Sequence, residues 1–394
     1  MRSVSEHLRE CLAAVGQLPP LSVALPDAVG CVLAEDVIAP ADNPVVDLAG
    51  CDGYALDAAT SRDGRARVMD VVRAGSVEQV RLVPGSVVRI DSGAPMPVGA
   101  NAVVPLEDTD LGDAVVGISA PVEPGQNVRP RASVASSGQT VLARGTRVGP
   151  RQIALLAGLG RARVLVHPKP RVVIVSVGDE LTEPGRPASA GQVHDANGHA
   201  LATCVHDADG VPLRVGAVSD RVGELGEVLE DQLVRADLLL TTGGLSQGDT
   251  VRDVVSAMGD VRFDNVAISP GRRFGVGVVN DGTTPVFCLP GDPLAVQVAY
   301  ETFVRPALLT MAGYSEIYRP SVRAAVTEDW ISPQSEREFV PVILDGTPTG
   351  GYRARLAEPT LVGLAEANGL AVVPEGVSGV GQGDLLDCLI FDAR

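Results

Sequence analysis

The chain has 394 residues and is 45% hydrophobic, and its 49 Asp and Glu residues outnumber 32 Lys and Arg for a formal net charge of −17. This length suggests roughly two to four domains. The acidic balance disfavours nucleic acid and anionic lipid as partners, and no stretch approaches the roughly 18 uninterrupted apolar residues of a membrane span. We therefore expect a soluble, cytoplasmic protein that neither binds nucleic acid nor inserts into a membrane.

The first part of the chain alternates between helical and β patterns. Residues 3–16 space their apolar side chains at helical intervals, and residues 150–160 restore that pattern with Pro150 in the first turn. Short β-rich runs between glycines and prolines fill the region between them. We predict that the two helices pack together in a discontinuous N-terminal domain, residues 1–45 with 140–169, which flanks a β-rich domain at 46–139.

Strands and helices alternate beyond Pro170. Apolar runs at 171–178, 238–242 and 285–289 are typical of parallel strands buried on both faces. A helix that begins after Ser219 or Asp220, the expected caps, and a last helix at about 293–312 lie among them. This pattern predicts a doubly wound α/β domain at 170–314. The remaining residues, 315–394, return to short strands and indicate a small β domain.

Glycine-rich segments follow each of the three apolar strands, and they should lie at one edge of the sheet. Glycines let backbone amides approach a ligand closely, and the helix starts behind them favour negative charge, so the edge suits a phosphorylated ligand. The alternative is that these turns need glycine for their own geometry. The candidate binding residues at this edge are Gly178, Gly243, Gly244, Ser246, Gly271, Pro290, Gly291 and Asp292.

Charged residues share this predicted edge. The carboxylates of Asp179, Glu180, Asp249 and Asp292 are oxygen ligands suited to a divalent cation such as Mg²⁺, with Asp249 and Asp292 as the metal candidates. Arg272 and its neighbour bring guanidinium groups that suit phosphate or another oxyanion. The alternative is that these residues cap helices and pair with each other on the surface.

A series of motifs in chain order resembles the MoeA family, the molybdopterin molybdenumtransferases, whose eukaryotic relative is the E domain of gephyrin. The motifs extend over essentially the whole chain, which makes the series far more specific than any single glycine-rich loop. They are Cys51-Asp52-Gly53-Tyr54-Ala55, Ser92-Gly93-Ala94-Pro95-Met96-Pro97-Val98-Gly99-Ala100, residues 176–181, Gly243-Gly244-Leu245-Ser246 and Leu289-Pro290-Gly291.

The resemblance implies an elongated, L-shaped subunit in a homodimer, with a C-terminal β-barrel domain. It also implies an activity: adenylylated molybdopterin and molybdate are the substrates, Mg²⁺ assists, and AMP and molybdenum cofactor are released, alongside other enzymes of the molybdopterin pathway. The matching site would lie between the α/β domain of one subunit and the second domain of the other. Asp52 and Ser92 would come from one side, and Asp179, Glu180, Asp249, Gly243, Gly244 and Ser246 from the other. If the chain is a molybdenumtransferase, we expect Asp52, Asp179, Glu180, Asp249 and Arg272 to carry the reaction.

Several polar positions depart from the family pattern. The family's Arg-Gly-Glu-Asp is Arg131-Ala132-Ser133-Val134 here, its Lys-Pro-Gly-Lys-Pro is residues 269–273, its Asp-Thr-Asn is 195–197, and its Gly-Asn-Pro is 291–293. These changes leave it open whether the chain is an enzyme. The alternative is a gephyrin-like scaffold with an eroded site, in which a groove between the α/β and C-terminal domains binds a peptide of a membrane receptor or a tubulin-like division protein. Its aromatic anchors would include Phe303, Tyr314, Tyr318, Trp330 and Phe339.

Overall fold

The computed structural model describes residues 1–60, 64–245 and 249–391. Contacts divide the chain into two compact units. Unit 1 comprises residues 1–34, 145–153 and 163–394, and unit 2 comprises residues 35–144 and 154–162. The division into four domains inferred from the sequence stays a prediction.

Unit 2 is built on a five-stranded sheet with the order β8-β5-β7-β6-β9. Its central strands are almost wholly apolar, and side chains from both faces are buried, among them Tyr54 and Val88. The unit also contains two short antiparallel strand pairs. The sheet strands are β5 (Gly53–Leu56), β6 (Arg65–Val72), β7 (Ser86–Ile90), β8 (Ala102–Pro105) and β9 (Val115–Gly117), and the pairs are β4 (Leu48–Ala49) with β10 (Val128–Arg129) and β3 (Val37–Ile38) with β11 (Thr140–Leu142).

Ala132 of unit 2 has a left-handed backbone conformation, with φ of 61°. A non-glycine residue costs about 1–2 kcal/mol there, and glycine recovers this strain at an entropic cost of about 0.4–1 kcal/mol in the unfolded chain. We expect Ala132→Gly to stabilise the protein by about 0.5–1 kcal/mol, measured as a rise in the thermal midpoint. The exposed Ala143 lacks positive φ, so Ala143→Gly should not raise it. An equal effect of both substitutions would contradict the strain at Ala132.

Unit 1 contains a six-stranded sheet with the order β16-β13-β17-β21-β20-β18. The first four strands are parallel, and β20 runs antiparallel between β21 and β18. From β13 the chain passes to β16 on one side and then to β17 on the other, so the order reverses between β13 and β17. The strands are β13 (Arg171–Val177), β16 (Val211–Val218), β17 (Leu238–Gly243), β18 (Gly259–Asn265), β20 (Arg273–Val279) and β21 (Thr284–Leu289).

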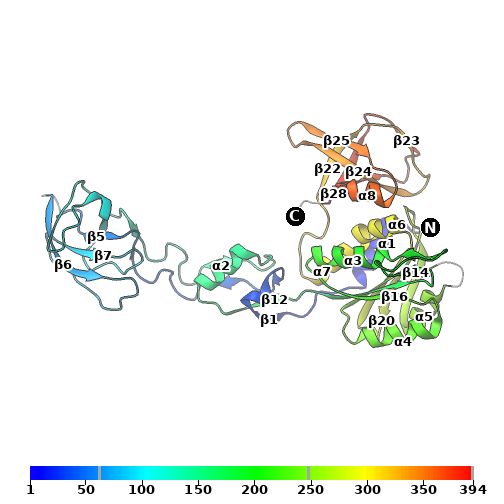
Figure 1. The fold of residues 1–394 in the computed structure, drawn as a ribbon, viewed down its shortest axis with the longest axis horizontal. Helices are drawn as coiled ribbons and strands as arrows, with labels where there is room; N and C mark the ends of the chain where they lie inside the picture. Colours follow the sequence, from blue (N-terminus) through cyan, green and yellow to red (C-terminus); the bar gives the residue numbers. More distant parts are fainter. Residues whose placement is uncertain (61–63, 246–248, 392–394) are drawn as a thin grey trace. The chain divides into compact units, whose positions relative to one another are not determined.

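Helices cover both faces of this sheet (Figure 1). Helices α4 (Val222–Leu233) and α5 (Thr250–Met258) pack on one face around Leu225 and Val251. Helices α3 (Ala196–Asp207), α6 (Pro293–Ala299) and α7 (Arg305–Met311) pack on the other. The single helix expected at 293–312 is divided by a π-helical turn (Tyr300–Val304). The doubly wound α/β fold predicted from the sequence is confirmed.

Helix α1 (Val4–Ala13) packs on the α/β fold, so the prediction that it packs against the helix near residue 150 is wrong. Its apolar side chains join the core formed by β20, the π turn and α7. A small sheet of β1 (Leu21–Ala24), β12 (Arg163–His167) and β2 (Val32–Leu33) follows, and α2 (Pro150–Gly158) spans the boundary between the two units. Apolar spacing predicted the helix but not its partner.

His7 of α1 is a buried base in this core. Its side chain is 2% exposed, and its ring lies 5.4 Å from that of Phe274 and 4.8 Å from that of Phe303. Burial disfavours the charged imidazolium and lowers the pKa of His7 from 6.5 to about 4. Between these two pH values only the unfolded state binds the proton. The free energy of unfolding should therefore fall by about 3 kcal/mol as the pH falls from 6.5 to 4.

Replacing His7 with leucine should remove this part of the acid sensitivity, because leucine has no proton to gain on unfolding. The measurement is the thermal midpoint of the parent protein and the His7→Leu variant at several pH values between 7 and 4. The exposed residue His206 provides a control substitution, since its side chain is 79% accessible. If the thermal midpoint decreased identically with falling pH in the parent and in the His7→Leu variant, this result would contradict the contribution of His7 to the acid sensitivity.

The C-terminal part of unit 1 is a closed β-barrel. Its strands pair in the order β24-β25-β22-β28-β26, and the pairing of β26 with β24 closes the cycle. A short strand of the α/β part, β19 (Ile268–Ser269), adds to β24. The barrel elements are β22 (Ser321–Val326), β24 (Arg337–Thr347), β25 (Gly351–Leu356), α8 (Leu361–Glu366), β26 (Gly369–Val373) and β28 (Leu385–Ile390).

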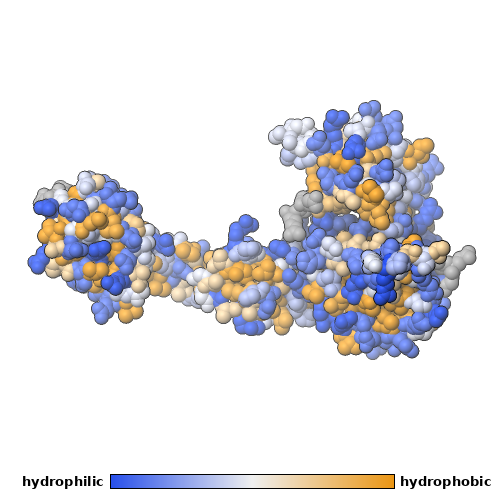
Figure 2. Space-filling view, viewed as in Figure 1, coloured by the Kyte–Doolittle hydropathy of each residue, from blue (hydrophilic) through white to orange (hydrophobic). Residues whose placement is uncertain are grey.

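Hydrophilic and hydrophobic residues intermingle on the visible face of each unit (Figure 2). None of the helices in the described part of the chain is long and apolar enough to cross a membrane. All six cysteines are free thiols, and four of them are buried. Burial raises the pKa of Cys288 to about 12, which keeps this thiol protonated and unreactive.

Candidate ligand-binding edge

The loops after β13, β17 and β21 lie at the same edge of the α/β sheet, as the sequence predicts, because these three strands are adjacent and parallel. The edge coincides with the place where the strand order reverses, between β13 and β17. Helices α3 and α5, which follow β13 and β17, lie on opposite faces of the sheet. In such folds, ligands bind beyond the carboxyl ends of the strands at this point. The predicted residues Gly178, Gly244 and Gly291 are on these loops, and Gly243 is the last residue of β17.

Two glycines at the end of β17 require their lack of a side chain. Gly243 has φ of 84°, and a Cβ atom there would lie 2.3 Å from the Val177 carbonyl oxygen. Gly244 has φ of 65°, and its Cβ atom would lie 2.5 Å from Val251. The loop therefore lies directly against β13 and α5. This packing explains both glycines without a ligand, although it also places the loop backbone at the edge of the sheet. Ser246, another predicted residue, lies outside the described residues.

Asn197, in the first turn of α3, connects two of the loops. Its Nδ2 atom donates to Thr242 Oγ1 at 3.0 Å and to the Gly291 carbonyl oxygen at 2.8 Å. Thr242 in turn donates to the Pro290 carbonyl oxygen at 2.7 Å. The ends of β17 and β21 are thus fixed to each other and to the start of α3. Asn197 was not among the predicted site residues, although it lies within the segment 195–197 that corresponds to a family motif.

Asp195, the N-cap of α3, anchors this arrangement from beneath the edge. Its side chain is 1% exposed and accepts hydrogen bonds from Ser176 Oγ and the Gly198 amide, each at 2.9 Å. Arg214 of β16 supplies the opposite charge at 3.0 Å and also pairs with Glu183. The Arg214 hydrogen bond is the largest cause that lowers the pKa of Glu183. This network fixes the start of α3 and hence Asn197.

The two acidic residues after β13 differ in their contacts. Asp179 accepts hydrogen bonds from Ser219 Oγ at 2.7 Å and the Asp220 amide at 3.3 Å, which lower its pKa. The expectation that Ser219 or Asp220 caps α4 is wrong, since Arg221 occupies the cap position and makes no side-chain capping bond. Ser219 instead fixes Asp179. Glu180 is exposed, and its carboxylate has no hydrogen bond to another described residue.

The two carboxylates predicted to bind a metal already have protein partners. Asp292 caps α6, accepting a hydrogen bond from the Ala295 amide at 2.9 Å. Asp249 pairs with Arg273 at 3.1 Å, and Arg273 also donates to the Leu245 carbonyl oxygen at 2.8 Å. The described residues contain no group of three or more His, Cys, Asp or Glu side chains placed to hold a metal ion. A metal centre made by the protein alone does not fit this edge.

The predicted residues Asp52 and Ser92 belong to unit 2, where they lie next to each other. Oδ1 of Asp52 accepts a hydrogen bond from the Ser92 amide at 2.6 Å, and both residues are exposed. This bond fixes the carboxylate between β5 and the end of β7. The pairing supports treating the two motifs as one group. Neither motif revealed the pairing by itself, since 40 residues separate them.

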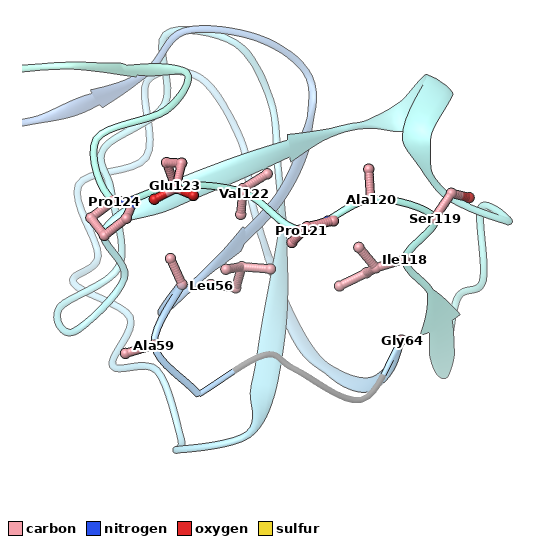
Figure 3. Close-up of a pocket in the computed structure, with 11 residues that line it drawn as sticks. Leu56, Ala59, Gly64, Ile118, Ser119, Ala120, Pro121, Val122, Glu123 and Pro124 are labelled. Atoms are coloured by element: carbon pink, nitrogen blue, oxygen red, sulfur yellow. The ribbon is translucent and has the colours of Figure 1, made fainter.

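A pocket of 510 Å³ in unit 2 is lined mainly by short apolar side chains (Figure 3). Leu56 lies on one side of it, and the segment from Ile118 to Pro124 lines another (Figure 3). Among the described residues that line it, Glu123 is the one with an ionisable side chain. The pocket does not contain any of the predicted site residues.

The fold and the edge define a class of protein: a doubly wound α/β protein with glycine-rich loops at one edge of its sheet, joined to a β-barrel and a β-rich unit. Three family models match in chain order. They are the MoeA N-terminal region (domain I and II) at residues 2–160, a probable molybdopterin binding domain at 173–310, and the MoeA C-terminal region (domain IV) at 323–391. The chain belongs to the MoeA family.

Named relatives agree with this membership. The chain is 37% identical to molybdopterin molybdenumtransferase 2 of Mycobacterium tuberculosis H37Rv, over 98% of both chains. It is 31% identical to the molybdopterin molybdenumtransferase of Bacillus subtilis, over 94% of this chain and 89% of the relative. The crystal structure of a molybdopterin biosynthesis MoeA protein from Pyrococcus horikoshii superposes with a TM-score of 0.83 at 27% identity, covering 100% and 99% of the two chains.

The scaffold alternative is not favoured by these comparisons, in which the relatives are named as transferases. The structure also removes two of its suggested anchors from the surface. Phe303 is 1% exposed and Phe339 is 5% exposed, and both belong to the core of unit 1. Their contribution is therefore to packing. Of the suggested anchors, Tyr318 is a largely exposed aromatic residue, at 59%.

Proposed function

We propose that this protein is a molybdopterin molybdenumtransferase that converts adenylylated molybdopterin and molybdate into molybdenum cofactor and AMP. The observation that carries the proposal is the match of MoeA models along the chain, combined with 37% identity to a named transferase over 98% of both sequences. The glycine-rich edge at the strand reversal supports a phosphorylated substrate, since this is where doubly wound folds bind such ligands.

Release of AMP requires cleavage of the phosphoanhydride of the substrate. Water adds its hydroxyl group to one phosphorus atom as the bridging P–O bond breaks, and its remaining proton goes to the other phosphate. The amides of the three loops would hold the phosphates, and Arg272 would stabilise the charge that develops as the bond breaks. The exposed carboxylates of Asp52 and Glu180 are the candidates to orient water or the pterin.

Mg²⁺ would enter the site together with the substrate. Mg²⁺ usually keeps several waters and binds through one or two carboxylates plus substrate phosphates. Asp292 uses one carboxylate oxygen for the helix cap, which leaves the other for such an ion. The chemistry that Mg²⁺ supplies is neutralisation of phosphate charge. Asp249 is the weaker candidate because Arg273 already neutralises it.

The family resemblance extends the proposal to assembly. A homodimer should have twice the 40.7 kDa mass of the single chain in analytical ultracentrifugation. The proposed reaction also requires another enzyme that supplies the adenylylated pterin. The departures at 131–134 and 269–273 bear on the rate rather than on the class of reaction. Lost or altered charged groups commonly cost orders of magnitude in rate, so we expect a slower enzyme than relatives that retain them.

The test is release of AMP from adenylylated molybdopterin by the purified protein, with and without molybdate and Mg²⁺, followed by chromatography. We expect AMP to form with the protein and to depend on molybdate. A folded protein that releases no AMP under these conditions would overturn the proposal. Heat-denatured protein serves as the control for spontaneous cleavage of the anhydride.

A further inference from the structure

A buried carboxylate of the barrel pairs with an exposed guanidinium of the ligand-binding edge. Nη2 of Arg272 contacts Oε1 of Glu336, whose residue is 3% exposed, whereas the Arg272 side chain remains 63% accessible. A buried carboxylate is costly unless a positive group compensates it. The Arg272 guanidinium is therefore held in place at one end while most of its surface stays available to a ligand.

Arg272 occupies a central position at the edge. A side chain at the preceding Gly271 would meet Ala295 Cβ at 3.0 Å and Pro290 Cγ at 3.2 Å, so this loop passes close to the end of β21 and the start of α6. The following residue, Arg273, donates to the Leu245 carbonyl oxygen on the loop after β17. Arg272 is thus held between segments that contact two of the three glycine-rich loops.

The backbone on both sides of Glu336 is fixed. Ser335 adopts a left-handed conformation with φ of 64°, and its amide donates to the Glu375 carbonyl oxygen at 3.1 Å. The Arg337 amide donates to the Ala267 carbonyl oxygen at 2.9 Å, and Arg337 pairs with Ile268 where β24 meets β19. The position of Glu336 is therefore determined by the junction of the barrel with the α/β fold.

Arginine suits a shared role of this kind. Its guanidinium carries five N–H donors in a rigid plane, so a contact through Nη2 leaves donors for a second anion. An exposed arginine that is free to rotate must lose side-chain entropy when it binds phosphate. The contact with Glu336 orders the guanidinium before the ligand arrives.

We propose that Glu336 is a positioning residue, which orients the Arg272 guanidinium toward a phosphate group bound at the edge and so makes the barrel part of the binding site. The identity of the phosphate as that of AMP or its precursor rests on the proposed function. Removal of the Glu336 charge should weaken phosphate binding, and this effect should depend entirely on the presence of Arg272.

The experiment is a double-mutant cycle on the full-length protein, with AMP as the probe and calorimetry as the readout. The variants are Glu336→Gln, Arg272→Gln and the double substitution. Glu375→Gln is the matched control, because it removes the same charge from another Glu–Arg pair of the barrel, Arg337 with Glu375 at 3.0 Å. Circular dichroism establishes that each variant is folded before titration.

We expect Glu336→Gln to weaken AMP binding about tenfold, and Glu375→Gln to change it by less than about twofold. In the Arg272→Gln background, the Glu336 substitution should add less than about twofold. The inference is overturned if Glu336→Gln leaves AMP affinity unchanged, or if its effect persists without Arg272. Molybdate-dependent AMP release with an unaffected Glu336→Gln variant would overturn this inference alone, whereas a parent protein that neither binds nor releases AMP would overturn the proposed function as well.

Discussion

Replacement of Asp52 by alanine is expected to lower the rate of AMP release by at least about 100-fold. The carboxylate is exposed just before the start of β5 and is oriented by the Ser92 amide at 2.6 Å. No other hydrogen bond joins it to a described residue, so it remains available to a ligand. The fold should survive, because an exposed carboxylate contributes little to stability. The measurement is the initial rate of AMP formation at saturating adenylylated molybdopterin.

The matched control for Asp52 is Asp113, an exposed carboxylate of the same unit that pairs with Arg89 at 3.2 Å. Asp113→Ala should leave the rate within about twofold of the parent value. Equal rates for Asp52→Ala and the parent would contradict a role for Asp52 in the reaction. They would leave its hydrogen bond to Ser92 as a purely structural feature of the turn.

Replacement of Arg214 by methionine is expected to destabilise unit 1 by about 3–5 kcal/mol. Methionine keeps much of the length of arginine but leaves the carboxylate of Asp195, 1% exposed, without a compensating charge. Ser176 and the Gly198 amide satisfy only the other oxygen, Oδ1. The measurement is the thermal midpoint by scanning calorimetry, together with the affinity for AMP. This affinity should fall because Asp195 fixes the start of α3 and thereby positions Asn197, which connects the loops after β17 and β21.

Arg221 provides the comparison for Arg214, since it also pairs with a glutamate but is 73% exposed. Loss of an exposed pair typically costs less than about 1 kcal/mol, so Arg221→Met should shift the midpoint little. If Arg214→Met were no more harmful than Arg221→Met, the network around Asp195 would not anchor α3. The loops that Asn197 connects would then be held by other contacts.

The sequence was sufficient to predict the α/β fold and the edge, because both follow from local patterns. Continuous apolar runs predicted β13, β17 and β21, and adjacent parallel strands necessarily bring their following loops together. Glycine pairs in those loops then predicted where backbone approaches closely, as at Gly243. These signals lie within a few residues of each other.

Partners that are distant in the chain could not be predicted in this way. Arg214 is 19 residues from Asp195, and Glu336 belongs to the barrel, 64 residues beyond Arg272. Nothing in the local spacing of a charged residue reveals which opposite charge it will meet. The same limit explains the wrong partner for α1, whose apolar stripe indicates a buried face but not what covers it. The wrong cap at Ser219 arose because its hydroxyl bonds to Asp179 instead.

The measurement that tests the central claim most directly is the ratio of AMP released to molybdenum incorporated. A single turnover with adenylylated molybdopterin, molybdate and Mg²⁺ is followed by separation of the pterin, and molybdenum in the pterin fraction is determined by mass spectrometry. A molybdenumtransferase should give equal molar amounts of AMP and pterin-bound molybdenum. AMP without pterin-bound molybdenum would identify a phosphoanhydride hydrolase instead. If the folded protein formed neither AMP nor pterin-bound molybdenum, this result would contradict an enzymatic role at this edge.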